Sequence, residues 1–229
     1  MNFDIFKIGH RGAAGHIAEN TVESVKKAIE LGATGIEVDV HVCASGELVV
    51  FHDFTLDRVT NSTGEIAQKT LSELKQLKVL GEFEIPTLDE VVSVLDNNTL
   101  LNIELKGQNT TKPVARFIER HVEKKGWAWR DFLVSSFQKD LLEQVYATHL
   151  PIMLGVLTDT NLEEALNFAR QIQAVSIHPD YTMLTDEHVK NIQSNNMQVI
   201  TYTVNDKVHI ERLKAYGVDG IISDFPDRL

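Results

Sequence analysis

Cysteine is almost missing from this sequence of 229 residues, because Cys43 is its single example. One cysteine cannot form a disulfide within the chain, and such sparing use is typical of proteins from a reducing compartment. The opening residues MNFDIFKIG contain no basic segment followed by an apolar run, so they do not resemble a secretory signal. We therefore expect a cytoplasmic protein.

Positive charge is also scarce. The chain has 22 Lys and Arg against 33 Asp and Glu, which gives a formal net charge of −11. This excess of negative charge argues against general binding to nucleic acid or to an anionic membrane. No apolar stretch approaches the roughly 18 residues of a membrane-spanning helix, so we expect no stable insertion into a bilayer. Any anionic substrate must therefore find a locally positive pocket, and the composition does not indicate an oligomeric state.

Linkers and low-complexity segments are absent as well, so we expect one domain over residues 1–229. Short runs rich in Val, Ile and Leu alternate with longer amphipathic segments. Most of these runs lack polar–apolar alternation, which is typical of parallel strands buried on both faces. The expected strands are Phe6–Gly9, Gly35–Val42, Leu48–Phe51, Thr99–Leu105, Phe132–Ser135, Ile152–Val156, Ala174–Ile177, Gln198–Val204 and Gly220–Ser223.

Signals for helix ends fall between these runs. A cap residue followed three positions later by Glu is typical of a helix start, and glycine is typical of a helix end. The expected starts are at Asn20, Thr70, Thr87 and Asn161, and the expected ends are at Gly32, Gly126 and Gly217.

Eight core strands remain when Leu48–Phe51 is set aside as a strand that returns along its neighbour. Eight strands alternating with helices in a chain of this length predict an α/β fold, the (β/α)8 TIM barrel. A doubly wound open sheet is the alternative. The absence of Gly-x-Gly-x-x-Gly and Walker sequences weighs against a nucleotide-binding sheet.

Polar and titratable side chains gather where the expected strands end. In a barrel all of these positions reach the C-terminal rim, where catalytic residues lie. The residues concerned are His10, Arg11, Glu37, Asp39, Glu104, Lys106, Ser135, Ser136, His178, Tyr202, Asn205 and Asp224.

Three of these residues are carboxylates that we expect to converge. Glu37 and Asp39 are two positions apart and therefore share one face of a strand, and Glu104 ends the next core strand. Carboxylates that lie close together must be protonated, paired with cations or bound to a metal. An oxygen-only ligand set suits Mg²⁺ or Ca²⁺. The alternative is an ordinary salt-bridge network in which Glu37 pairs with Lys106 or Arg11.

Two histidines are expected beside these carboxylates. If the turn after Val42 centres between Ser45 and Gly46, antiparallel pairing places His52 opposite Asp39. His10 reaches the same rim from the first strand. Two such imidazoles suit a general acid and a general base. Most of the other histidines are expected to be bystanders, although His178 follows a strand and is a candidate for lining the pocket.

Arg11 and Lys106 place fixed positive charge beside the carboxylates. A guanidinium offers a planar fork to phosphate oxygens, and an ammonium offers a point charge. Together with a metal and two histidines, they suit phosphoryl transfer, where catalysis is mostly positioning and charge neutralisation. The absence of a Gly-x-Ser-x-Gly elbow argues against acyl hydrolysis.

Several motifs together resemble those of the glycerophosphodiester phosphodiesterases, in the right order over essentially the whole chain. They are Gly9-His-Arg-Gly12, Glu19-Asn-Thr21, Gly35-Ile-Glu-Val-Asp39, Val50-Phe-His-Asp53, Thr55-Leu-Asp-Arg58, Asn61-Ser-Thr-Gly64, Ile85-Pro-Thr-Leu88, Asn102-Ile-Glu-Leu-Lys106, Tyr202-Thr-Val-Asn205, Asp219-Gly-Ile-Ile-Ser-Asp224 and Pro226-Asp-Arg228.

This resemblance implies a metal-dependent barrel enzyme that hydrolyses glycerophosphodiesters, such as glycerophosphocholine or glycerophosphoethanolamine, to sn-glycerol 3-phosphate and an alcohol. By the same resemblance, one divalent cation, Mg²⁺ or Ca²⁺, is held by Glu37, Asp39 and Glu104, and His10 and His52 form the acid–base pair. Arg11 and Lys106 bind phosphate, and Tyr202 and Asn205 contact the substrate. The segment 54–86 is the family's small hairpin and helical insertion, and it covers the substrate mouth.

Three departures from the family pattern stand out. Ala18 replaces a frequent Pro, Cys43-Ala-Ser-Gly46 replaces the usual turn, and Tyr202 replaces a frequent Trp, which bears on the choice of head group. Two other functions stay open. One is a phospholipase C- or D-like enzyme acting on lysolipids, and the other is an inactive barrel that binds a phosphorylated ligand.

Overall fold

The computed structural model describes residues 5–229, and its parallel strands close into a barrel. The closing contact is made by β1 (Phe6–Gly9), which pairs with β9 (Gly220–Ser223) on one side and β2 (Gly35–Val42) on the other. Between β2 and β9 lie β4 (Leu100–Leu105), β5 (Phe132–Ser136), β6 (Met153–Thr158), β7 (Ser176–Pro179) and β8 (Gln198–Thr201). The predicted (β/α)8 barrel is therefore confirmed, and the open sheet is wrong because the edges β1 and β2 are bonded.

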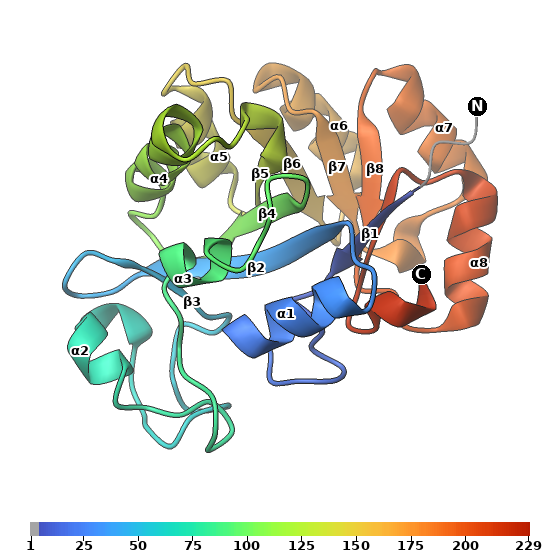
Figure 1. Ribbon diagram of the computed structural model, residues 1–229. Coiled ribbons are helices and arrows are strands. Elements are labelled where there is room, and N and C mark those ends of the chain that lie inside the picture. The colour runs from blue at the N-terminus through green and yellow to red at the C-terminus, as the bar shows by residue number, and fades with distance from the viewer. Residues whose placement is uncertain (1–4) are drawn as a thin grey trace.

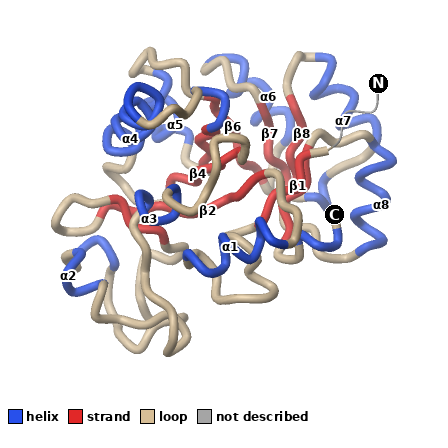
Figure 2. Tube along the Cα trace, in the orientation of Figure 1, coloured by secondary structure: helices blue, strands red, loops and turns tan. Residues whose placement is uncertain are grey.

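Helices surround the strands (Figures 1 and 2). They are α1 (Val22–Glu30), α3 (Leu88–Val92), α4 (Thr111–Lys124), α5 (Lys139–Tyr146), α6 (Leu162–Gln171), α7 (Asp186–Ser194) and α8 (Lys207–Tyr216). Most of the buried apolar residues pack between these helices and the outward faces of the strands. Most of the longer helices are amphipathic, and their buried apolar residues pack against the barrel.

The inside of the barrel changes character along its axis. Ile8, Leu133, Ile200 and Ile222 form a small apolar cluster across the strands. Nearer the C-terminal rim, the buried inward-facing positions become polar or charged, and they include the three carboxylates predicted to hold a metal. The apolar layer supports a polar site at one end of the barrel, as is usual for this fold.

Strand prediction was accurate where an apolar run ended in clear turn residues. The bounds of β1, β2 and β9 match the expected ones residue for residue. The last expected strand before β9 was too long. It ends at Thr201, because Tyr202 forms only an isolated bridge to Asp180 and Val204 bonds instead to Ile222.

Helix caps agree with the sequence signals at most positions. Thr70 and Thr87 form complete capping boxes with Glu73 and Glu90, whereas Asn161 accepts a bond from the Glu164 N–H without the reciprocal one. The cap expected at Asn20 is wrong. Thr21 caps α1 by accepting from the Ser24 N–H. Asn20 is used elsewhere, as described below. The expected glycine ends at Gly32, Gly126 and Gly217 all have positive φ.

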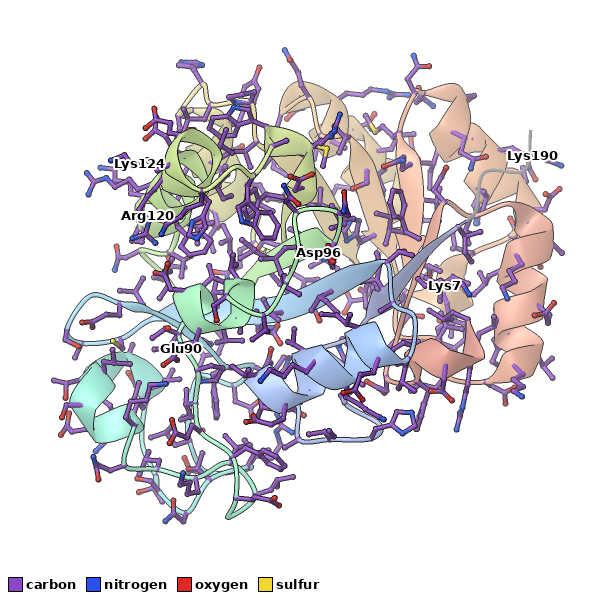
Figure 3. The ribbon with its side chains drawn as sticks, viewed as in Figure 1. Lys7, Glu90, Asp96, Arg120, Lys124 and Lys190 are labelled. Atoms are coloured by element: carbon purple, nitrogen blue, oxygen red, sulfur yellow. The ribbon has the colours of Figure 1, made fainter. Side chains whose placement is uncertain are left out.

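The segment 54–86 follows β3 (Leu48–Val50), which pairs antiparallel with β2, and it contains α2 (Leu71–Leu74). It has a small apolar core of its own, in which Leu56, Ile66 and Ile85 are fully buried. Lys75 bonds at 2.6 Å to Glu90, which Figure 3 labels, and so ties the segment to α3. Figure 1 shows it beside the β2–β3 hairpin, away from α5–α8.

Within residues 5–229 no helix combines the length and the apolar character needed to cross a bilayer.

Two glycines with positive φ differ in the space around the position of a Cβ atom. Replacing each with alanine therefore separates the cost of backbone strain from the cost of steric overlap. A Cβ on Gly217 (φ 77°) meets nothing within 4 Å, whereas a Cβ on Gly12 (φ 84°) lies 2.5 Å from the Ser24 carbonyl carbon. We expect Gly217→Ala to lower the free energy of unfolding by about 1–2 kcal/mol, the cost of a left-handed alanine. Gly12→Ala should cost clearly more, because strain and overlap add. Urea unfolding of both variants measures the difference, and equal costs would contradict it.

Candidate active site

The three predicted metal-binding carboxylates come together through the pairing of β2 with β4. Asp39 lies opposite Glu104 in this register, and Glu37 lies two residues before Asp39 on the same inward face. One oxygen from each carboxylate lies within 4.8 Å of the others, and all three residues are buried. The register therefore creates a compact set of oxygen ligands at the C-terminal end of the barrel.

The electrostatics of this cluster fit a hard divalent cation. Burial, followed by repulsion from Asp39, raises the pKa of Glu104 to about 7, and burial, Asp39 and Glu104 raise that of Glu37 well above its ordinary value. Among the described residues, Glu37 Oε1 and Asp39 Oδ1 find no hydrogen-bond donor. Buried, unpaired carboxylate oxygens are costly. A cation with oxygen preference would relieve both the repulsion and the missing bonds.

The alternative of an ordinary salt-bridge network, in which Glu37 pairs with Lys106 or Arg11, describes only part of the observed contacts. Lys106 Nζ lies 2.9 Å from Glu104 Oε1 and 3.7 Å from Asp39 Oδ1. Burial opposes a charge on Lys106, but Glu104 and Asp39 together raise its pKa. Within residues 5–229, Glu37 has no side-chain cation in salt-bridge contact, and its one hydrogen bond is accepted from the backbone N–H of Arg11, at 2.8 Å. The two cations thus balance two carboxylates and leave the third open.

Arg11 is held in an unusual backbone conformation. Its φ is 49°, in the left-handed region that non-glycine residues seldom occupy. Its carbonyl oxygen accepts bonds from the Asn20 N–H and the Ser24 hydroxyl, both at 3.0 Å. Such strain, of order 1–3 kcal/mol, persists only where the surroundings fix it. In this backbone conformation, the Arg11 N–H points at Glu37 and the guanidinium Nε lies 3.4 Å from Asp39 Oδ2.

Asn20 is a site residue that sequence reasoning assigned to a helix cap. Its side-chain Nδ2 donates to Asp39 Oδ2 at 2.9 Å, and its Oδ1 accepts the Asp39 N–H at 3.2 Å. Asparagine tolerates the positive φ of 57° found here. The Asn20 amide therefore fixes the orientation of the Asp39 carboxylate, a role that the cap-like motif concealed.

His10 lies at the rim, as predicted, and its ring is held from behind. Its Nδ1 is 2.6 Å from Asp224 Oδ1. Asp224 in turn accepts from Asn205 Nδ2 at 2.6 Å, and its N–H donates to Asn205 Oδ1 at 2.9 Å. This arrangement leaves Nε2 of His10 as the nitrogen available for chemistry, with its ring orientation fixed by a carboxylate.

His52 reaches the site by a different route from the one predicted. Val40 pairs with Val50, so Asp39 lies opposite Phe51, and the predicted register is wrong by one residue. The turn is centred on Ser45, since the Cys43 N–H bonds to the Glu47 carbonyl. His52 therefore lies beyond the end of β3.

The His52 ring is nevertheless placed beside the predicted phosphate-binding lysine. Its Nδ1 lies 2.5 Å from Asp53 Oδ1, and its Nε2 lies 3.2 Å from Lys106 Nζ. An ammonium group only donates, so Nε2 accepts and the ring is neutral in this arrangement. Burial lowers the pKa of His52, and the positive charges of Arg11 and Lys106 act in the same direction against Asp39 and Asp53.

The two residues predicted to contact substrate are already engaged within the protein. The Tyr202 hydroxyl donates to the Thr158 carbonyl at 3.1 Å, and its ring meets Phe137 edge to face. Burial raises the pKa of Tyr202. Both polar atoms of the Asn205 amide bind Asp224. Their contacts with substrate stay predictions, and Asn205 is placed to position His10 through Asp224.

His178 lies inside the barrel and does not line an open pocket. It is fully buried, and its Nε2 lies 2.8 Å from the Ser176 hydroxyl. A Cβ on Gly155 would lie 2.6 Å from the same nitrogen, so glycine provides the space for the ring. Burial lowers the pKa of His178 to about 3.

Comparison with known proteins gives one consistent family. The profile described as the glycerophosphoryl diester phosphodiesterase family matches residues 10–228. A glycerophosphodiester phosphodiesterase from Caldanaerobacter subterraneus is 36% identical over 97% of this chain and 95% of the relative. A Bacillus subtilis glycerophosphodiester phosphodiesterase is 30% identical over 97% of this chain and 84% of its own length.

Solved structures agree with the sequence relatives. An Oleispira antarctica phosphodiesterase, solved in complex with the product sn-glycerol-3-phosphate, superposes with a TM-score of 0.85 at 29% identity, covering 96% of this chain and 93% of that one. A Thermotoga maritima glycerophosphodiester phosphodiesterase gives a TM-score of 0.83 at 28% identity, over 99% and 97% of the two chains.

The buried His178 predicts a specific loss of stability in acid. Its pKa is about 3 when folded and about 6.5 when unfolded, so between these values only the unfolded chain takes up the proton. Stability is therefore lost as the pH falls from about 6.5 towards 3, by at most about 5 kcal/mol. Urea unfolding across this range should show a shallower loss for His178→Gln than for the wild type. The exposed His188→Gln should follow the wild type, and parallel curves for all three proteins would contradict the assignment.

Proposed function

Because this chain belongs to the glycerophosphoryl diester phosphodiesterase family, we propose that it hydrolyses glycerophosphodiesters, such as glycerophosphocholine or glycerophosphoethanolamine, to sn-glycerol 3-phosphate and an alcohol. The observation that carries the proposal is the convergence of Glu37, Asp39 and Glu104 beside two histidines whose Nδ1 atoms are both held by carboxylates. A protein that only binds a phosphorylated ligand has no need of two imidazoles oriented in this way.

The carboxylate triad would hold one divalent cation, Mg²⁺ or Ca²⁺. Such an ion polarises a phosphoryl oxygen and offsets negative charge that develops during displacement at phosphorus. Around it, Arg11 and Lys106 supply further positive charge for the phosphate. Arg11 offers a fork that can donate to two phosphate oxygens, and Lys106 lies between Glu104 and His52. These residues bind and orient the phosphodiester.

The two histidines divide the proton transfers. His10 takes the proton of the attacking hydroxyl through Nε2, with its ring fixed by Asp224. His52 gives a proton to the leaving alcohol oxygen, and for this role its Nε2 must first release Lys106 and bind a proton. The attacking group is the substrate's own 2-hydroxyl, which forms a cyclic phosphate that water opens in a second step with the roles reversed. Direct attack by water is the alternative. A trapped cyclic glycerophosphate supports the first route, and single-step inversion at phosphorus supports the second.

A panel of substrates with and without chelator tests the activity and its metal requirement. We expect release of sn-glycerol 3-phosphate from glycerophosphocholine and glycerophosphoethanolamine, loss of release in excess chelator, and recovery with Mg²⁺ or Ca²⁺. Asp39→Asn and Glu104→Gln should be inactive, while the exposed Glu163→Gln should match the wild type. Full activity in chelator would overturn the metal assignment, and hydrolysis of lysophosphatidylcholine alone would favour the phospholipase alternative.

His10 and His16 provide a matched pair for the acid–base assignment. Both are bonded to an aspartate, at 2.6 Å to Asp224 and 2.7 Å to Asp227, but only His10 lies at the rim beside the triad. His10→Gln should lower kcat by roughly 10²–10⁴-fold, as for a positioned acid or base. His16→Gln should leave kcat unchanged. A similar loss in both variants would mean that the effect comes from the fold of this loop.

A further inference from the structure

Arg58, in the insertion, donates four hydrogen bonds to two carboxylates outside the segment 54–86. Its Nε and Nη2 donate to the two oxygens of Asp53, at 2.6 and 3.1 Å. Its Nη2 and Nη1 donate to the two oxygens of Glu19, at 2.6 and 3.1 Å. One guanidinium therefore makes two forked pairs with carboxylates from two separate loops.

Each of these carboxylates holds an active-site side chain. Asp53 Oδ1 lies 2.5 Å from Nδ1 of His52. Glu19 Oε1 accepts from Nη1 of Arg11 at 2.8 Å. The chain of contacts thus runs from the imidazole through Arg58 to the guanidinium at the other side of the site, with a carboxylate at each step.

The insertion holds Arg58 in place by packing. Leu56 is fully buried and Val59 nearly so, and both belong to the apolar core of the segment 54–86. Ala18, the residue before Glu19, packs into the same core. The core and the ion pairs therefore join the same two parts of the chain.

The contacts of Arg58 fix the orientation of the Asp53 and Glu19 carboxylates more than they stabilise the fold. The side chain of Arg58 is 47% exposed, and exposed ion pairs contribute little to folding. Two forked pairs on one planar group do, however, restrict the rotation of both carboxylates. The Arg58 pair also holds the pKa of Asp53 down to about 2, so this carboxylate stays charged towards His52.

We propose that Arg58 is a positioning residue that orients His52 and Arg11 at the same time, so that the insertion forms part of the catalytic architecture. The inference rests on the proposed function, because it assigns a purpose to the orientation of two groups used in that reaction. Displacement of a reacting group by about 1 Å can cost on the order of 100-fold in rate. A lysine cannot replace Arg58, since one ammonium cannot make both forked pairs.

Steady-state kinetics of Arg58→Gln and Arg58→Lys test the proposal, with Arg120→Gln and Arg120→Lys as controls. Arg120 on α4 (Figure 3) is equally exposed, at 47%. Its Nη2 bonds both oxygens of Asp89, at 2.7 and 2.8 Å. We expect both Arg58 variants to lose roughly 10–100-fold in kcat, the range usual for residues that orient the groups in contact with a reaction centre. We expect a smaller rise in KM. Their urea midpoints, and the kinetics of both Arg120 variants, should equal those of the wild type.

The double variant Arg58→Gln/Asp53→Asn tests whether Arg58 acts by orienting Asp53, and through it His52, or only by its positive charge. If Arg58 acts through Asp53, the double variant should be no slower than the slower single variant. Recovery of wild-type kcat in Arg58→Lys, or additive losses in the double variant, would overturn the proposal. If the wild type releases no sn-glycerol 3-phosphate from any diester, the proposed function fails instead. An active wild type whose Arg58 variants match the Arg120 variants refutes only the inference.

Discussion

The concentration of negative charge at the end of β2 and β4 is the constraint on which the rest of the site depends. Parallel pairing places Asp39 beside Glu104, and the alternation of strand side chains adds Glu37 on the same face. Three buried carboxylates repel one another, so the surrounding chain must supply cations and donors. The Lys106 ammonium and the Asn20 amide answer this need directly. The strained backbone of Arg11 is explained in the same way, because it brings a donor to Glu37.

Around this centre, the two histidines are held by similar carboxylates in different surroundings. Asp224, behind His10, is bonded to the neutral amide of Asn205. Asp53, behind His52, is bonded to the charged guanidinium of Arg58. The negative charge behind His52 is therefore balanced by a nearby cation, whereas a neutral group holds the one behind His10. Environments that differ in this way allow two identical side chains to take opposite parts in proton transfer.

The sequence predicted those features that depend on local pattern. Buried apolar runs with clear ends predicted the strands, and polar residues at strand ends predicted which side chains gather at the rim. The His52 register could not be predicted, because the position of a turn within Cys43–Glu47 decides it and a shift by one residue changes every partner. Asn20 was missed because its cap-like context gave a sufficient local explanation. Arg58 lies 39 positions from Glu19, and no spacing rule connects side chains so far apart along the chain.

The sign of charge at the site bears on how so acidic a protein could bind an anionic phosphodiester. If all three carboxylates are ionised, the positive charges of Arg11 and Lys106 are too few to balance them, and a phosphate is repelled. A divalent cation on the triad would add two positive charges at this point. Such an ion would therefore do more than activate the phosphate, because it would favour anion binding in a chain whose formal net charge is −11. Substrate affinity and metal occupancy should then be linked, each strengthening the other.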